Sequence, residues 1–173
     1  RKETSKLFPV NGPEGRRLYE GAEDEVFVEV GGDYEFGFGP GRLKAIGLVR
    51  RDDSPIIDRV FRGDVDGMDI SESLFTRDIE EGEYILRTEY GLAFENGNDW
   101  QFALEGAFNY LDQQSSLASS EDGSPLELQT LPNANSRVEE QRGEVSVTHG
   151  RRLSPSVTGQ VSMGAEISEL SQS

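Results

Sequence analysis

The sequence predicts an all-β fold built from antiparallel hairpins, and three observations lead to that prediction. Six segments of the chain alternate apolar and polar side chains with a period of two, which is typical of β-strands with one apolar face. No segment shows a convincing helical period. Short turns and long polar stretches alternate between the segments, so we expect about six strands in three hairpins.

The N-terminal part contains the first expected hairpin. Residues 1–24 are polar and rich in Gly and Pro, which indicates a loop. The hairpin follows at 25–51. Its first strand, 25–38, places valines and aromatic residues opposite acidic ones, and the GPG turn at 39–41 leads into a strand with weaker alternation at 42–51.

The second hairpin, residues 83–111, has the clearest pattern. The acidic stretch 52–82 that precedes it is expected to be a long external loop. The Asn-Gly pair in the turn at 96–99 supplies the positive φ angles of a tight hairpin. From Trp100 to Tyr110, the large apolar side chains fall on even numbers and the polar or small ones on odd numbers.

The third hairpin, residues 137–168, follows a second expected external loop at 112–136. Its strands cover 137–149 and 156–168 on either side of a short turn. The chain starts without an initiator Met or a signal-peptide pattern and ends without a terminal aromatic residue. We therefore expect a fragment or a processed chain.

The alternation leaves open which face of the strands meets water, as in a soluble β-sandwich or in an outer-membrane barrel. Strands of about 9–11 residues suit a tilted bilayer crossing. Connections that alternate between short and long are also typical of such barrels. The aromatic residues form two groups at opposite strand ends, Phe36, Phe38, Phe94 and Trp100 by the short turns and Tyr84, Phe108 and Tyr110 by the long loops.

These observations favour an antiparallel transmembrane β-barrel segment in the outer membrane. Outer-membrane lipid would contact its apolar face, and its polar face would line the lumen. Six strands are too few to close such a barrel, whose smallest examples have about eight. Unpaired strand edges are untenable in lipid, so the expected partner is the rest of the same barrel.

The composition excludes several classes of function. The chain has 33 acidic and 17 basic residues and a formal net charge of −16, which argues against binding to nucleic acid. Without Cys and with a single His, the sequence offers no thiolate metal site and no nucleophile–base pair. We therefore predict no enzyme, no catalytic residue and no cofactor. His149 lies on the apolar register of its strand, where we expect an interfacial ring rather than a metal ligand.

Three stretches carry a family resemblance: "GGDYEFGFGPGRLKAIGLVRR", "EYGLAFENGNDWQFALEGAFNYLD" and "RVEEQRGEVSVTHGRRLSPSVTGQVSMGAEIS". Together they resemble the barrel of TonB-dependent receptors from Gram-negative bacteria, over roughly residues 25–168. The resemblance implies a barrel of about 22 strands filled by an N-terminal plug domain. It also implies import of scarce nutrients, energised by the TonB complex. We find no counterpart of the plug or of the TonB box within residues 1–173.

The resemblance implies part of a receptor for active uptake of a small solute, such as a siderophore, vitamin or oligosaccharide. A passive porin or channel is one alternative, and a non-membrane β-sheet binding module is another. If this chain contacts the solute, we expect the polar-face residues Arg87, Glu89 and Glu105 to do so, together with the acidic stretch 52–82. Such an acidic wall would favour cationic or metal-chelate solutes through its field.

The acidic stretch includes "DVDGMDISE", whose Asp64, Asp66 and Asp69 offer oxygen ligands of the kind that Ca²⁺ prefers. The stretch departs from the EF-hand order, in which Gly occupies the sixth position of the loop. We therefore expect a solvated acidic loop and no metal site there.

Overall fold

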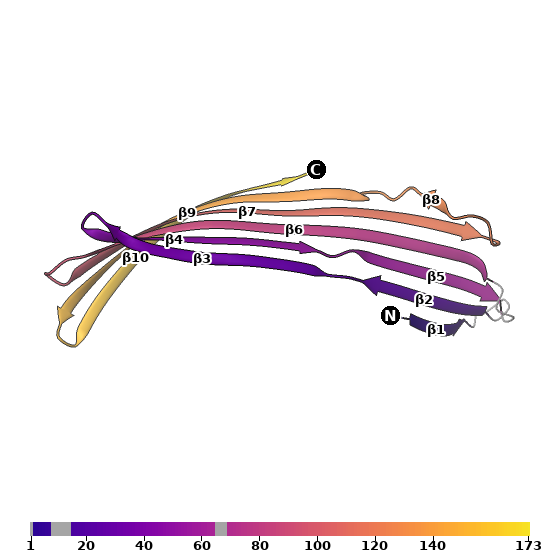
Figure 1. The fold of residues 1–173 in the computed structure, drawn as a ribbon, viewed down its shortest axis with the longest axis horizontal. Coiled ribbons are helices and arrows are strands. Elements are labelled where there is room, and N and C mark those ends of the chain that lie inside the picture. Colours follow the sequence, from indigo (N-terminus) through magenta and orange to yellow (C-terminus); the bar gives the residue numbers. More distant parts are fainter. Residues whose placement is uncertain (1, 8–14, 65–68) are drawn as a thin grey trace. The chain divides into compact units, whose positions relative to one another are not determined.

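The computed structural model describes residues 2–7, 15–64 and 69–173 (Figure 1). Among these residues all regular structure is β-strand, and no helix is long and apolar enough to cross a membrane. The ten strands are β1 (Lys2–Leu7), β2 (Gly15–Glu23), β3 (Val26–Phe38), β4 (Gly41–Asp53), β5 (Ile56–Asp64), β6 (Asp69–Ala93), β7 (Asn98–Glu121), β8 (Glu127–Gln129), β9 (Asn135–Ser154) and β10 (Val157–Gln172). The all-β prediction is confirmed.

The chain forms two compact units where one domain was expected. Unit 1 combines Arg1–Val26, Asp52–Glu80 and Asp112–Arg137, and unit 2 combines Phe27–Arg51, Glu81–Leu111 and Val138–Ser173. The strands β6, β7 and β9 are long enough to contribute residues to both units, and β6 has 25 residues. Each unit is described separately below.

Unit 2 contains the three predicted hairpins. Its strands are hydrogen-bonded in the order β3-β4-β6-β7-β9-β10. The sheet is open, since β3 pairs only with β4 and β10 only with β9 among the described strands. The turn forms at the predicted place, with a bond of 2.9 Å from Phe94 N to Asn98 O. Of the Asn-Gly pair, Gly97 alone has a positive φ, at 76°, so the expected positive φ at Asn96 was wrong. Gly97 O also accepts a hydrogen bond of 3.0 Å from Arg152 N on β9.

The two faces of unit 2 differ in chemistry. The apolar face carries most of the exposed large hydrophobic side chains: Leu104 is 61% exposed and Val161 is 72% exposed. Phe27 and Leu170 are exceptions, since they are exposed on the polar register of β3 and β10. The polar face carries the charged side chains, with the small Ala103 and Ala107 buried between them on β7. No core of large side chains exists among the described residues, because neither face is covered.

The alternation of residues 42–51 is too weak to show which residues share a face, but the ion pairs of β4 do show it. Lys44 Nζ lies 3.1 Å from Asp33 Oδ2 of β3, and Arg42 pairs with Glu35. Even-numbered residues of β4 therefore belong to the polar face. The odd-numbered ones, including Gly47 and Val49, belong to the apolar face.

Aromatic rings on the apolar face of unit 2 form two groups. Near the short turns, the rings of Trp100 and His149 lie 4.4 Å apart, and Phe102 stacks on Trp100 at 6.2 Å. Near the middle of β7, the ring of Tyr84 stacks on Phe108 at 6.2 Å and on Tyr110 at 6.5 Å. His149 thus lies beside Trp100 on the apolar face, and its place at a membrane interface stays a prediction.

Two kinds of glycine occur in unit 2. Neighbouring atoms occupy the space beside some of them: a Cβ at Gly82 would lie 2.1 Å from Cε1 of Tyr110, and one at Gly41 would lie 2.4 Å from Gly91 O and 2.7 Å from Cζ of Tyr90. Other glycines are open, since a Cβ at Gly106 would meet nothing within 4 Å. The first kind fixes how neighbouring strands pack, and the second leaves backbone uncovered.

Unit 1 is a second antiparallel arrangement, with strand contacts β1-β2, β2-β5, β5-β6, β6-β7 and β7-β8. The register pairs Leu18 of β2 with Phe61 of β5. Polar cross-strand contacts accompany it: Tyr19 Oη donates to Asp58 Oδ1 at 2.5 Å, and Arg59 Nε lies 3.2 Å from Glu72 Oε1.

The loop predictions were wrong in most of their extent. Residues 1–24 contain β1 and β2, residues 52–82 contain β5 and the first part of β6, and residues 112–136 contain the end of β7, all of β8 and the start of β9. The search for alternating apolar and polar residues did not detect these strands, because polar side chains lie on both of their faces. Cross-strand pairing, rather than an apolar face, accounts for their β-structure.

Candidate functional site

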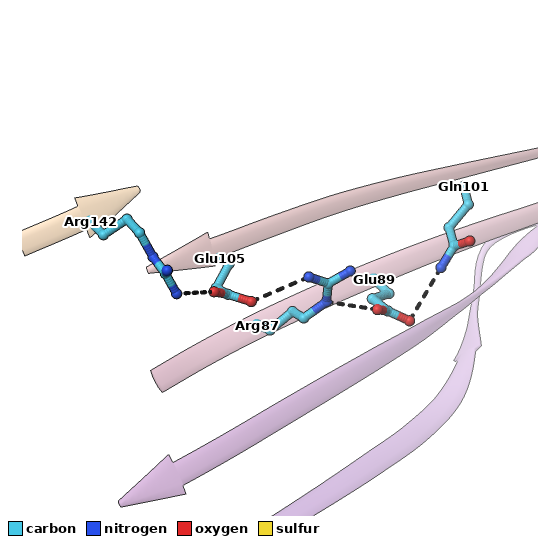
Figure 2. Close-up of polar contacts among 5 residues, drawn as sticks. All are labelled: Arg87, Glu89, Gln101, Glu105 and Arg142. Atoms are coloured by element: carbon cyan, nitrogen blue, oxygen red, sulfur yellow. Dashed lines mark hydrogen bonds and ion pairs between the residues drawn. The ribbon is translucent and has the colours of Figure 1, made fainter. Parts of the chain in front are cut away.

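A network of charged and amide side chains crosses the polar face of unit 2, and we call it the polar network. Its members are Arg87 and Glu89 on β6, Gln101 and Glu105 on β7, and Arg142 on β9 (Figure 2). The two-residue period of a strand brings each pair to the same face. The open antiparallel order β6-β7-β9 then sets the three strands side by side.

Glu105 is the centre of the polar network. Its Oε2 lies 3.2 Å from Nη1 of Arg87, and its Oε1 lies 3.0 Å from Nη2 of Arg142, so one carboxylate joins two guanidinium groups. Arg87 Nε also donates to Glu89 Oε1 at 2.7 Å. Gln101 Nε2 donates to the other oxygen of Glu89 at 3.2 Å, which extends the network along the sheet (Figure 2).

The burial of these side chains is uneven. The side chain of Glu105 is 14% exposed, whereas that of Arg142 is 34% exposed. Ala103 and Ala107 flank Glu105 on the same face and leave room for the long side chains to lie across the sheet. Glu105 is therefore the most desolvated charge of the group, and it has two cationic partners.

Further ion pairs occupy the same polar face. Arg42 pairs with Glu35 and Lys44 with Asp33, and Asn109 Nδ2 donates to Glu140 Oε2 at 3.0 Å. Carboxylates without a cationic partner among the described residues also lie on this face, namely Glu29, Glu144 and Glu166. The cations of the network are neutralised while several carboxylates are not, so the face has a negative field.

Three of the predicted contact residues, Arg87, Glu89 and Glu105, come together in the polar network. Their role in binding stays a prediction. Asp64 ends β5 and Asp69 begins β6, so neither lies in a loop, and Asp66 lies outside the described residues. Within the part of the chain that the structure describes, no group of three or more His, Asp or Glu side chains is placed to hold a metal ion.

Sequence reasoning missed two members of the polar network, Gln101 and Arg142. The alternation places Gln101 on the polar face, but an amide gives no reason to single it out. Arg142 is 37 residues from Glu105 in the sequence. A long connection separates β7 from β9, so the register between these two strands cannot be predicted from the sequence. Only the pairing of these two strands reveals the contact.

The comparisons with known proteins add no identification. No protein-family model and no curated protein matches the chain.

Proposed function

We propose that unit 2 is a lipid-facing wall segment of an outer-membrane β-barrel that belongs to a TonB-dependent receptor for active uptake of a scarce solute. One observation supports it above the others: all six adjacent strands expose large apolar side chains on the same face, and only two such side chains, Phe27 and Leu170, are exposed on the other face of the described part of unit 2. Exposed apolar patches of this extent are rare on soluble monomers, because water does not favour them. Lipid is the solvent that does.

The spacing of the two aromatic groups supports the same proposal. Trp100 and Tyr110 are ten residues apart on β7, which corresponds to about 33 Å along a strand. With a tilt of roughly 40°, typical of membrane barrels, that length projects to about 25 Å across the membrane. This matches the height of the apolar band of such barrels, which aromatic girdles border on both sides.

The open edges of unit 2 support a larger assembly. β3 and β10 each lack a neighbour on one side among the described strands, and both are long. In a hydrocarbon environment their free N–H and C=O groups require partners. We propose that other strands of the same barrel provide them, with the plug domain and the TonB complex as the further partners of the receptor.

On this proposal the polar face lines the lumen and contacts the solute. The polar network contributes a fixed set of donors and acceptors, and the carboxylates without partners give the wall its negative field. The solute class that fits this wall is a small cationic molecule or a metal chelate with positive groups at its surface. A passive channel uses the same wall without an energy source, so uptake that persists without a proton-motive force would favour that alternative.

A pair of charge substitutions in the full-length protein tests which face meets lipid. Leu104 points from the middle of the apolar band, and Leu104→Arg should destabilise the folded protein by about 2–4 kcal/mol, because lipid does not solvate the guanidinium. Gln101→Arg is the comparison on the polar face: it places the same charge beside Glu89, nearer to the short turn than Leu104, and should have little effect.

The measured quantity is the fraction of folded protein in lipid vesicles at increasing urea concentrations. Gel mobility of unboiled samples separates the folded from the unfolded protein. Equal costs for the two substitutions, or a larger cost for Gln101→Arg, would contradict the proposal. A monomeric, cooperatively folding protein in buffer without detergent would instead favour the non-membrane β-sheet module.

A further inference from the structure

A pocket of about 350 Å³ opens on the polar face of unit 2, and residues of β4, β6, β7, β9 and β10 line it. The outer lining residues on β6 are Glu81 and Glu83, which belong to the polar face. Those on β7 are Asn109 and Leu111, which belong to the same face. None of the five members of the polar network lines this pocket. Its volume lies within the range of small-molecule sites and exceeds that of a bare ion.

Three further carboxylates of the polar face line the pocket without a cationic partner among the described residues. Glu81 and Glu83 make no hydrogen bond or ion pair there. Glu140 accepts a hydrogen bond of 3.0 Å from Asn109 Nδ2, which is a neutral donor. The guanidinium of Arg50 also lines the pocket, but it lies over an aromatic ring of β3, 4.9 Å from the ring centroid. The negative charges therefore outnumber the positive one, and their field attracts a cation.

The amide of Asn109 has an acceptor that the described part of the chain leaves unpaired. Its Nδ2 donates to Glu140, while its Oδ1 is buried and has no hydrogen-bond donor among the described residues. A buried acceptor without a partner is costly, because it has lost its water and gained no bond in exchange. A ligand that brings N–H groups to Glu140 would supply the missing donor. This acceptor is an observation independent of the charge, and it favours a ligand with N–H donors.

Apolar side chains form the remaining part of the pocket lining. They are Leu111, Val138 and Leu170. Leu170 is 70% exposed, and besides Phe27 it is the only exposed large apolar side chain on the polar face of the described part of unit 2. The strand register places Leu170 directly opposite Glu140, so apolar surface adjoins a carboxylate. A hydrocarbon group covers such a surface better than water does.

We propose that this pocket binds the transported solute as an amphipathic organic cation, whose ammonium group pairs with Glu83 and Glu140 and whose hydrocarbon part covers Leu170. The N–H groups of the ammonium also supply the donor that Asn109 Oδ1 lacks. The inference rests on the proposed function, because the polar face meets a transported solute only where it lines the lumen. It narrows the solute class, since the field attracts any cation but the apolar lining favours one with a hydrocarbon part.

The test uses a fluorinated phenethylammonium ion as the probe, titrated into the full-length protein in nanodiscs and followed by fluorine NMR. Empty nanodiscs give the amount of probe that enters lipid. A fluorinated phenylacetate carries the same ring with the opposite charge, and methylammonium carries the charge without the ring. We expect saturable binding of the phenethylammonium probe, at least about fivefold tighter than the binding of either comparison compound.

Two variants test the two parts of the pocket. Glu83→Gln should weaken probe binding by about twofold to fivefold, the range that one partly exposed charge pair supports, and Glu81→Gln makes the same test if that variant does not fold. Leu170→Gln removes apolar surface from an exposed position and should weaken binding by about threefold to tenfold.

Glu166→Gln is the matched control for the carboxylates. It makes the same change on the polar face, four residues before Leu170 on β10. That separation is about 13 Å along a strand, beyond the screening length of about 8 Å at physiological salt, so probe binding should stay unaltered.

Two outcomes would overturn the inference while a membrane-inserted barrel stays intact. One is equal binding of the phenethylammonium and phenylacetate probes by the wild type. The other is unchanged binding of the phenethylammonium probe in the folded Glu83→Gln and Leu170→Gln variants. Saturable binding that depends on Glu83 in a protein recovered as a soluble monomer would instead overturn the proposed function, and the bound cation would then not be a transported solute.

Discussion

Gly82 lies beneath the ring of Tyr110, and enlarging it should disturb the pairing of β6 with β7. A Cβ at Gly82 would lie 2.1 Å from Cε1, 2.6 Å from Cζ and 2.9 Å from Cδ1 of that ring, all below any real contact distance. Overpacking of this kind costs about 1–3 kcal/mol, because the ring or the backbone must move. We therefore expect Gly82→Ala to destabilise the folded protein by that amount.

Removing the ring should reverse the sign of the effect. In a Tyr110→Ala background the alanine at position 82 has room, and it also restricts the unfolded chain, which stabilises by about 0.4–1 kcal/mol. The coupling between the two positions is then about 1.4–4 kcal/mol. A Tyr110→Phe background keeps the ring, so Gly82→Ala should stay costly there.

The measurement is a double-mutant cycle from urea unfolding in vesicles, with Gly91→Ala as the control. Gly91 is on β6 as well, and a Cβ there meets nothing within 4 Å. The reasoning fails if Gly82→Ala costs no more than Gly91→Ala. It also fails if the cost of Gly82→Ala is the same with and without the Tyr110 ring.

Three further predictions concern the polar network and the aromatic rings. Glu105→Gln leaves Arg87 and Arg142 with a neutral acceptor, so the free energy of unfolding in urea titrations should fall by about 1 kcal/mol. The loss is small for two ion pairs because both arginine side chains are partly exposed to solvent. Arg42→Gln removes an ion pair whose arginine side chain is 74% exposed, and the same titrations should show a change below about 0.5 kcal/mol. On the proposed membrane position, Trp100 should be quenched more strongly by lipids brominated near the headgroup than by lipids brominated at the chain end, because it belongs to an aromatic group at one end of the apolar band. The opposite order of quenching would place it near the bilayer centre.

The hairpins of unit 2 could be predicted because two local signals agree there. The alternation from Trp100 to Tyr110 reflects two faces of different chemistry, and the Asn-Gly turn fixes where the chain reverses. Both signals depend on neighbours in the sequence. The polar face of β6 and β7 followed from them, and with it the positions of Arg87, Glu89 and Glu105.

The strands of unit 1 were missed because their side chains carry no such contrast. β2 pairs with β5 along nine positions, yet polar residues such as Arg17 and Arg62 lie opposite each other in that register. The contact of Arg142 with Glu105 was missed for a different reason, since it depends on a register between strands that a long connection separates. Neither feature leaves a periodic trace in the sequence.

The hydrogen bond from Arg152 N to Gly97 O has a practical consequence for labelling the molecule. It ties the turn of one hairpin to a strand of the next, so an epitope or fluorophore inserted at Gly97 would perturb both hairpins together. The turn between β9 and β10 is closed by a local bond from Ser156 N to Ser154 Oγ. An insertion there disturbs only its own hairpin, so it is the better position for a label that tests whether the short turns emerge at a membrane surface, as the proposed function requires.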